Sequence, residues 1–155
     1  MSSEGGQHAD TNGFRPLDRS TYAIRRRASF PSTRESINDA IETILAVARR
    51  CGCSSENEAD LEIALREALA NAVIHGNEED ESKSVFVRCY GGDDQTLILV
   101  RDEGAGFEPA EIPDPRGSDR VELDHGRGLF LMRALMDEVE FRRDGREVLL
   151  FKRWA

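Results

Sequence analysis

The chain has 155 residues, the length of one ordinary domain, of which 39% are hydrophobic and 33% are charged. Its 30 acidic and 21 basic residues give a formal net charge of −9, which disfavours nucleic acid as a direct partner because the phosphate backbone repels an acidic surface. No apolar run approaches the roughly 18 to 20 residues that span a bilayer, and no secretory signal is recognisable. We therefore expect a cytoplasmic protein without membrane contact.

The first residues predict a tail and then a strand. Residues 1–19 are Gly, Ser, Asn and charged residues with almost no apolar content, which is typical of a disordered segment. We expect one domain over residues 20–155. β-compatible residues over 21–30 predict its first strand.

A first helix follows that strand. Ser32 or Thr33 is a suitable N-cap, with Glu35 in the first turn, and Gly52 lies just past the expected end. Its predicted apolar face consists of Ile37, Ile41, Ile44, Leu45 and Ala48.

A second helix is predicted from Ser54 or Ser55 to about Gly76. Apolar residues recur along it at helical spacing and predict a buried stripe of Leu61, Leu65, Ala68, Leu69, Ala72 and Val73.

Beside that stripe the second helix carries Glu67, Asn71 and His75, spaced four residues apart and therefore neighbours on one face. A carboxylate takes up protons and an amide oxygen binds hard cations, so the pair Glu67 and Asn71 suggests chemistry on a phosphate ester. An ordinary solvated helix face is the alternative. For His75 the alternatives are orienting Glu67 or a phosphate, or ending the helix without a chemical role.

The second half of the chain reads as two hairpins separated by a long loop and a helix. Two strands over 84–90 and 96–101 flank a turn at 91–94, a helix is expected over 126–136, and two strands over 139–143 and 147–154 flank a turn at Asp144-Gly145. Adjacent hairpins favour a mostly antiparallel or mixed sheet with the helices on one face. A loop as long as 102–125 is usually functional.

The segment from Asp102 to Phe107 follows a strand directly. Asp102 at the strand end could accept a hydrogen bond from an exocyclic amine such as that of adenine, and Gly104 and Gly106 allow the backbone to approach a ligand. A Rossmann site is disfavoured because Pro109 prevents an immediate helix. A simple Asp/Gly turn is the alternative.

Gly126, Arg127, Gly128 and Leu129 open the third predicted helix, where free backbone N–H groups and the helix dipole favour an anion. A flexible helix entrance is the alternative. A P-loop is excluded because its Gly-Lys-Ser/Thr pattern does not occur.

Two further features have ordinary explanations. Cys51 and Cys53 lack a second cysteine pair, so we interpret them as small residues at a helix end, not as zinc ligands. Arg25, Arg26 and Arg27 could form a docking patch for an acidic partner, but charges that keep an edge strand soluble are the favoured interpretation.

Taken together, these segments resemble the GHKL ATPases, the group of gyrase, heat-shock chaperone, histidine kinase and mismatch-repair ATP sites. Glu67-x-x-x-Asn71 with His75-Gly76-Asn77 is similar to the N box, Asp102-x-Gly104-x-Gly106 to the G1 box and Gly126-x-Gly128 to the G2 box. The small size and the wording of these segments resemble the anti-sigma-factor serine kinases. Those kinases bind a sigma factor and phosphorylate a serine or threonine of an anti-sigma-factor antagonist, and they are commonly homodimers.

The resemblance implies a Bergerat fold, an α+β two-layer sandwich whose mixed, mostly antiparallel sheet has helices on one face, with ATP under a lid over residues 108–125. Glu67 would be the general base and Asn71 would bind Mg²⁺. Asp102 would bind the adenine amine, with close approach at Gly104 and Gly106. Residues 126–129, which are Gly126, Arg127, Gly128 and Leu129, would surround the phosphates.

The leading hypothesis is an ATP- and Mg²⁺-dependent serine/threonine kinase that also acts as an anti-sigma factor in a partner-switching circuit. A nucleotide-responsive binding module with little kinase activity is the alternative, although a pure binder needs neither Glu67 nor Asn71. A histidine-kinase fragment is disfavoured because no dimerising hairpin with a phosphoacceptor histidine precedes the domain.

Overall fold

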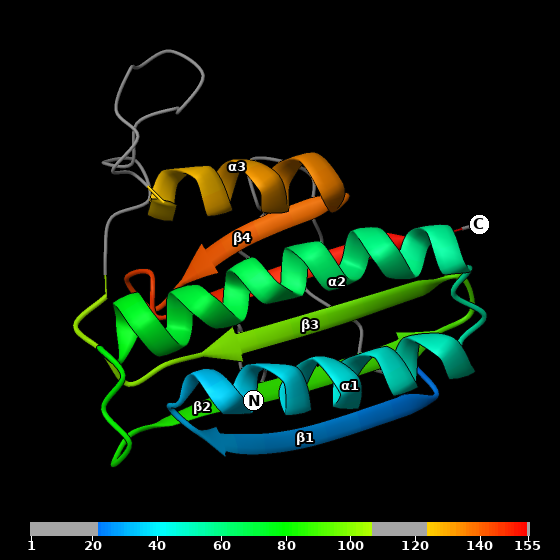
Figure 1. Cartoon of the computed structure of the whole chain (residues 1–155). Coiled ribbons are helices and arrows are strands. Elements are labelled where there is room, and N and C mark those ends of the chain that lie inside the picture. Colours follow the sequence, from blue (N-terminus) through cyan, green and yellow to red (C-terminus); the bar gives the residue numbers. More distant parts are fainter. Residues whose placement is uncertain (1–21, 107–123, 155) are drawn as a thin grey trace, which may run out of the picture.

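Residues 22–106 and 124–154 are described by a computed structural model of the chain (Figure 1). The expected tail over 1–19 lies outside the described residues. So does the expected lid over 108–125, except for its last two residues, which belong to a helix.

A five-stranded sheet forms one layer of the described part of the molecule. Its strands are β1 (Ile24–Pro31), β2 (Ser84–Gly92), β3 (Gln95–Arg101), β4 (Glu138–Arg142) and β5 (Glu147–Arg153). The order across the sheet is β1-β2-β3-β5-β4, and every neighbouring pair is antiparallel. The predicted α+β sandwich is thus confirmed.

Both predicted hairpin turns are present. Gly92 pairs with Gln95, so Asp93 and Asp94 form the tight turn between β2 and β3, with Asp94 at a φ of +64°. Asp144 and Gly145 lie in the turn between β4 and β5, and both have positive φ. Short-chain polar residues and glycine tolerate this left-handed conformation, which explains why the turns form at these sequences.

The helices cover one face of the sheet, with α2 lying between α1 and α3 (Figure 1). They are α1 (Arg34–Arg50), α2 (Ser55–Ala70), the π-helix η2 (Asn71–Gly76), which continues α2, and α3 (Asp124–Leu135). Thr33 and Ser54 are the N-caps of α1 and α2, and their side chains accept hydrogen bonds from Ser36 N and Asn57 N. Gly52 follows α1 with a φ of +85°.

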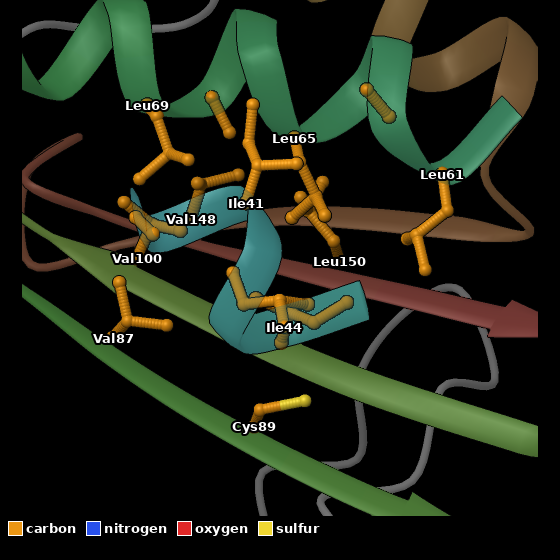
Figure 2. Packing of buried hydrophobic residues seen from close by; sticks show 14 of the residues in the cluster. Ile41, Ile44, Leu61, Leu65, Leu69, Val87, Cys89, Val100, Val148 and Leu150 are labelled. Carbon is orange, nitrogen blue, oxygen red and sulfur yellow. The ribbon is translucent and has the colours of Figure 1, made fainter. Parts of the chain in front are cut away.

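The core lies between α1, α2 and the sheet (Figure 2). The apolar stripes predicted for both helices are buried there, together with Val87, Cys89, Val100, Val148 and Leu150 from the strands. Because both helices bury a stripe against the same sheet face, the side of α2 that bears Glu67 is fixed relative to the strands.

The C-terminal end of α3 is attached to β5 by polar contacts. Lys152 is buried, and its Nζ donates to Leu135 O at 2.7 Å, so it satisfies a carbonyl at the helix end. Arg153 N donates to a carboxylate oxygen of Asp137 at 2.6 Å, and Asp137 N donates to Phe151 O. These bonds fix α3 across the sheet.

Several strand and helix boundaries differ from the predicted ones by one to three residues, and one predicted helix end differs in its type of turn. The second helix reaches Gly76 as expected, but its last turn is a π-helix, in which Asn77 N donates to Ala72 O, five residues back. Periodicity of apolar residues does not reveal such a widened turn, which is frequent at functional sites. The third helix begins at Asp124, two residues earlier than predicted.

Leu65 and Ile63 provide a matched test of this packing on α2. Leu65 is fully buried, whereas Ile63 is 45% exposed. We expect Leu65→Ala to lower the free energy of unfolding by about 2–5 kcal/mol, because it removes buried methyl groups and leaves a cavity. Ile63→Ala should change it by less than about 0.5 kcal/mol. Urea denaturation measures both, and equal losses would contradict the assigned face of α2.

Candidate functional site

Glu67 near the end of α2 and Asn71 at the start of η2 lie one turn apart, as predicted. The backbone N–H of Asn71 donates to Glu67 O, so regular α-helical spacing holds between them and places both side chains on one face. Glu67 is half-buried. Asn71 Nδ2 is buried and has no hydrogen-bond partner among the described residues.

An orphaned buried amide is unusual in a protein interior, because a donor without a partner costs free energy. The other atom of the same amide, Oδ1, is the kind of ligand that Mg²⁺ takes, and Nδ2 suits a phosphate oxygen. Asn71 therefore fits a bound phosphate group with its metal ion. Among the described residues, no group of three or more His, Cys, Asp or Glu side chains gathers to hold a metal.

The glycine-rich start of α3 lies against Glu67. A Cβ added at Gly128 would be 2.7 Å from Glu67 Oε2, so only glycine lets α3 approach α2 this closely without displacing the carboxylate. Residues more than 50 positions apart in the sequence are therefore brought together, as predicted for Glu67 and Gly128.

The neighbours of Gly128 have different surroundings. Arg127 is exposed, whereas Leu129 is 4% exposed and its side chain packs into the core, so its predicted place at the phosphates stays a prediction. Because α3 starts at Asp124, Gly126 lies in its first turn, where backbone N–H groups have no intrahelical partner, whereas the N–H of Arg127 is the first that bonds back along the helix. Anion binding by N–H groups is thus expected there more than at Gly128 and Leu129.

Asp102 follows β3 and lies against the end of η2. A Cβ at Gly76 would overlap the carboxylate of Asp102, and a Cβ at Gly104 would overlap Gly76 O. Gly104 N donates to Asp102 Oδ1 at 2.8 Å, and Asp102 N donates to Arg146 O at 2.9 Å. Glycine at positions 76 and 104 thus permits the strand end and the helix end to meet.

Burial raises the pKa of Asp102, and the hydrogen bond from Gly104 N, together with the charges of Arg146 and Lys83, partly opposes that rise. An ionised carboxylate that is short of water gains from a bound N–H donor. The exocyclic amine of adenine supplies such a donor, so this end of the site fits an adenine base.

Gly106 has a different setting from Gly104. Its φ is +84°, and a Cβ there would overlap Asp144 O in the turn between β4 and β5. Packing against this turn accounts for the glycine, so the predicted approach to a ligand at Gly106 stays a prediction.

Two neighbours of the predicted residues were not assigned a role from the sequence. They are Gly76, which lies against the carboxylate of Asp102, and Asn77, which follows Gly76 and is buried. His75, which precedes them on η2, is exposed. The sequence signal for them is a polar run directly after an apolar helix, which the chain shows as His75-Gly76-Asn77.

One continuous helical element therefore connects the two ends of the site. The carboxylate, the orphaned amide and α3 lie at one end, and Gly76 with Asp102 lies at the other. At the α-helical rise of about 1.5 Å per residue, the nine steps from Glu67 to Gly76 span at most roughly 14 Å, because the π-turn at the end is wider and shorter. An elongated ligand with a base at one end and phosphates at the other fits this arrangement.

A comparison with known families agrees with this geometry. Residues 30–152 match the family described as histidine kinase-like ATPase domain. The chain belongs to this family. ATP is the nucleotide that the family implies, which agrees with the fit of an adenine base at Asp102 and of phosphates at Asn71.

Among characterised relatives, the chain is similar to serine-protein kinase RsbW of Oceanobacillus iheyensis, with 34% identity over 71% of this chain and 73% of the relative. It is also 30% identical to anti-sigma F factor of Clostridium perfringens, over 83% of this chain and 96% of the relative. RsbW of Bacillus subtilis shows 37% identity over 63% of this chain and 64% of the relative.

The fold is also that of a solved structure, the crystal structure of the RsbU and RsbW domains of Rv1364c from Mycobacterium tuberculosis. The TM-score is 0.58 at 17% sequence identity, and the match covers 84% of this chain and 32% of the other. Within the described residues, no helix is long and apolar enough to cross a membrane.

Substituting Gly104 and Gly128 tests the two close approaches separately. Gly104→Ala places a methyl group against backbone, which cannot move alone, so we expect a loss of about 1–3 kcal/mol in the free energy of unfolding. Gly128→Ala meets the end of a flexible side chain and gains helix propensity, so its loss should be smaller. Chemical denaturation compares them, and the reverse order would contradict these contacts.

Proposed function

We propose that this protein is an ATP- and Mg²⁺-dependent serine/threonine protein kinase that acts as an anti-sigma factor and phosphorylates an anti-sigma-factor antagonist. The observation that carries the proposal is the contact of Gly128 on α3 with Glu67, one turn from the orphaned amide of Asn71. The names of the relatives, serine-protein kinase and anti-sigma F factor, support the same activity.

In this proposal each end of the site has its own task. Asp102 accepts a hydrogen bond from the adenine amine and selects the base. Asn71 holds Mg²⁺ through Oδ1, and the ion neutralises charge on the phosphates when it is bound. Backbone N–H groups in the first turn of α3, including that of Gly126, face the phosphates.

Glu67 is the general base of the transfer step. The substrate hydroxyl oxygen forms a bond to the γ-phosphorus of ATP while the bond from that phosphorus to the ADP oxygen breaks. The hydroxyl proton passes to a carboxylate oxygen of Glu67, and ADP leaves with the electron pair of the broken bond. Positioning and charge neutralisation account for most of the acceleration in such transfers.

The partners follow from the same proposal. One is a sigma factor and the other is the antagonist that carries the phosphoacceptor serine or threonine. β1 is an edge strand of the sheet, and it exposes Arg25, Arg26 and Arg27. This position agrees with both predicted interpretations, a docking patch for an acidic partner and charges that keep an edge strand soluble. A homodimer and a cytoplasmic location belong to the proposal as well.

Glu67→Ala tests the proton acceptor. We expect the variant to bind ATP with unchanged affinity but to transfer phosphate about 10²- to 10⁴-fold more slowly, because the hydroxyl loses its base. Radiolabelled ATP with the purified chain and antagonist-like proteins encoded nearby measures transfer. The matched control is Glu62→Ala, which removes a partly exposed ion pair on the same helix and should leave transfer unchanged.

If the wild-type chain binds ATP but labels no antagonist-like protein, the kinase proposal is wrong and a nucleotide-responsive binding module replaces it. If Glu67→Ala and Glu62→Ala have the same transfer rate, Glu67 is not the base.

Asp102→Asn tests the adenine end. The amide keeps an oxygen for Gly104 N but can present its NH₂ group to the adenine amine, so ATP affinity should fall about 10- to 100-fold by calorimetry.

A raised folded-state pKa means that protonating Asp102 adds stability at low pH, which is lost as the pH rises through that folded pKa. At neutral pH the nucleotide-free variant should therefore be at least as stable as the wild type.

Thermal melting of the nucleotide-free protein checks this second expectation. A variant that loses both ATP affinity and stability would show that Asp102 serves the fold and not the base.

A further inference from the structure

Three chain segments meet beside Asp102 in a closed ring of hydrogen bonds. Asn77 Nδ2 donates to Ser84 O at 3.0 Å, Ser84 N donates to Glu103 Oε2 at 2.8 Å, and Glu103 N donates to Asn77 Oδ1 at 2.8 Å. The ring joins the end of η2, the start of β2 and the residue after Asp102.

Asn77 is the buried member of this ring. Its exposed fraction is 0%, and its backbone is also paired, because Asn77 N donates to Ala72 O and Asn77 O accepts from Asp80 N. Both atoms of its side-chain amide are therefore used, one as donor and one as acceptor. Aspartate lacks the donor, leucine lacks both atoms, and serine is too short to span the two segments.

The ring holds the backbone directly after Asp102. Asp102 N is held by Arg146 O on the β5 side, and the next N–H along the chain, that of Glu103, is held by Asn77. The two peptides that flank the Cα of Asp102 are thus fixed, the one before it by Arg146 and the one after it by Asn77. Gly76 O approaches Gly104 closely on the same side, so the backbone that follows Asp102 has little room to move.

We propose that Asn77 is a positioning residue that sets Asp102 against the nucleotide base and thereby determines the preference for adenine. The inference rests on the proposed ATP binding, and it goes beyond it by assigning base discrimination to a residue that does not touch the ligand. Through η2, the same residue links the base end of the site to the helix that carries Asn71 and Glu67.

The test compares ATP with purine riboside triphosphate, which lacks the 6-amino group, by calorimetry. Wild type should bind ATP about tenfold or more tightly than the amine-free nucleotide, since one charge-assisted hydrogen bond is absent. Asn77→Ala should bring this ratio close to one while the affinity for purine riboside triphosphate changes less than about twofold. A purely structural role would lower both affinities together or lower stability alone.

Two further variants keep the test decisive if Asn77→Ala does not fold. Asn77→Asp retains an acceptor for Glu103 N and should keep part of the preference. Glu103→Ala removes the bond from Ser84 N and leaves both bonds of Asn77, so its ratio should lie between those of wild type and Asn77→Ala. Ser82→Ala is the matched control, because its hydroxyl bonds Asp80 outside the ring, and its ratio should equal that of wild type.

An unchanged ratio in Asn77→Ala, or in Asn77→Asp and Glu103→Ala together, overturns the role of Asn77 while leaving ATP binding intact. Failure of wild type to bind either nucleotide overturns the proposed function instead. The two failures are therefore distinguishable.

Discussion

The candidate site depends on one close approach of backbone to backbone. Gly76 O occupies the space that a side chain at position 104 would need, and Asp102 occupies the space that a side chain at position 76 would need. Because the two segments meet at glycines, the chain after β3, which bears Asp102, reaches the helical element that bears Glu67 and Asn71. Without that approach, the carboxylate of Asp102 after β3 and the amide of Asn71 on η2 would belong to separate parts of the molecule.

The sequence predicted most of the fold because its local signals agree with one another. Thr33 and Ser54 begin helices whose apolar stripes are buried, and Asp144 with Gly145 forms the turn that their conformational tolerance suggests. The two strands of a tight hairpin are antiparallel, so the pairings of β2 with β3 and of β4 with β5 followed from the turns. The pairing of β3 with β5 joins two segments that are distant in the sequence. No local signal specifies this pairing, so only the structure reveals it.

The site was predictable in its residue types and only partly in its contacts. The spacing of Glu67 and Asn71 fixes them on one face, since helix geometry is local. The contact of Gly128 with Glu67 and the ring around Asn77 arise from packing between distant segments, and periodicity carries no information on those. The π-turn at η2 likewise ends at Asn77, whose side chain is bonded to two distant segments.

Because η2 continues α2 without a break, this helical element fixes the distance between the two ends of the candidate site. Its length between Glu67 and Gly76 sets how far the adenine end stands from the phosphate end. Each residue inserted or deleted there would lengthen or shorten the span by about 1.5 Å and rotate one end against the other by about 100°. We therefore infer that substitutions in this stretch are tolerated on its apolar side more readily than any change in the number of residues. The number of residues between Glu67 and Gly76, and not their identities alone, therefore determines the size of the nucleotide that fits between the two ends of the site.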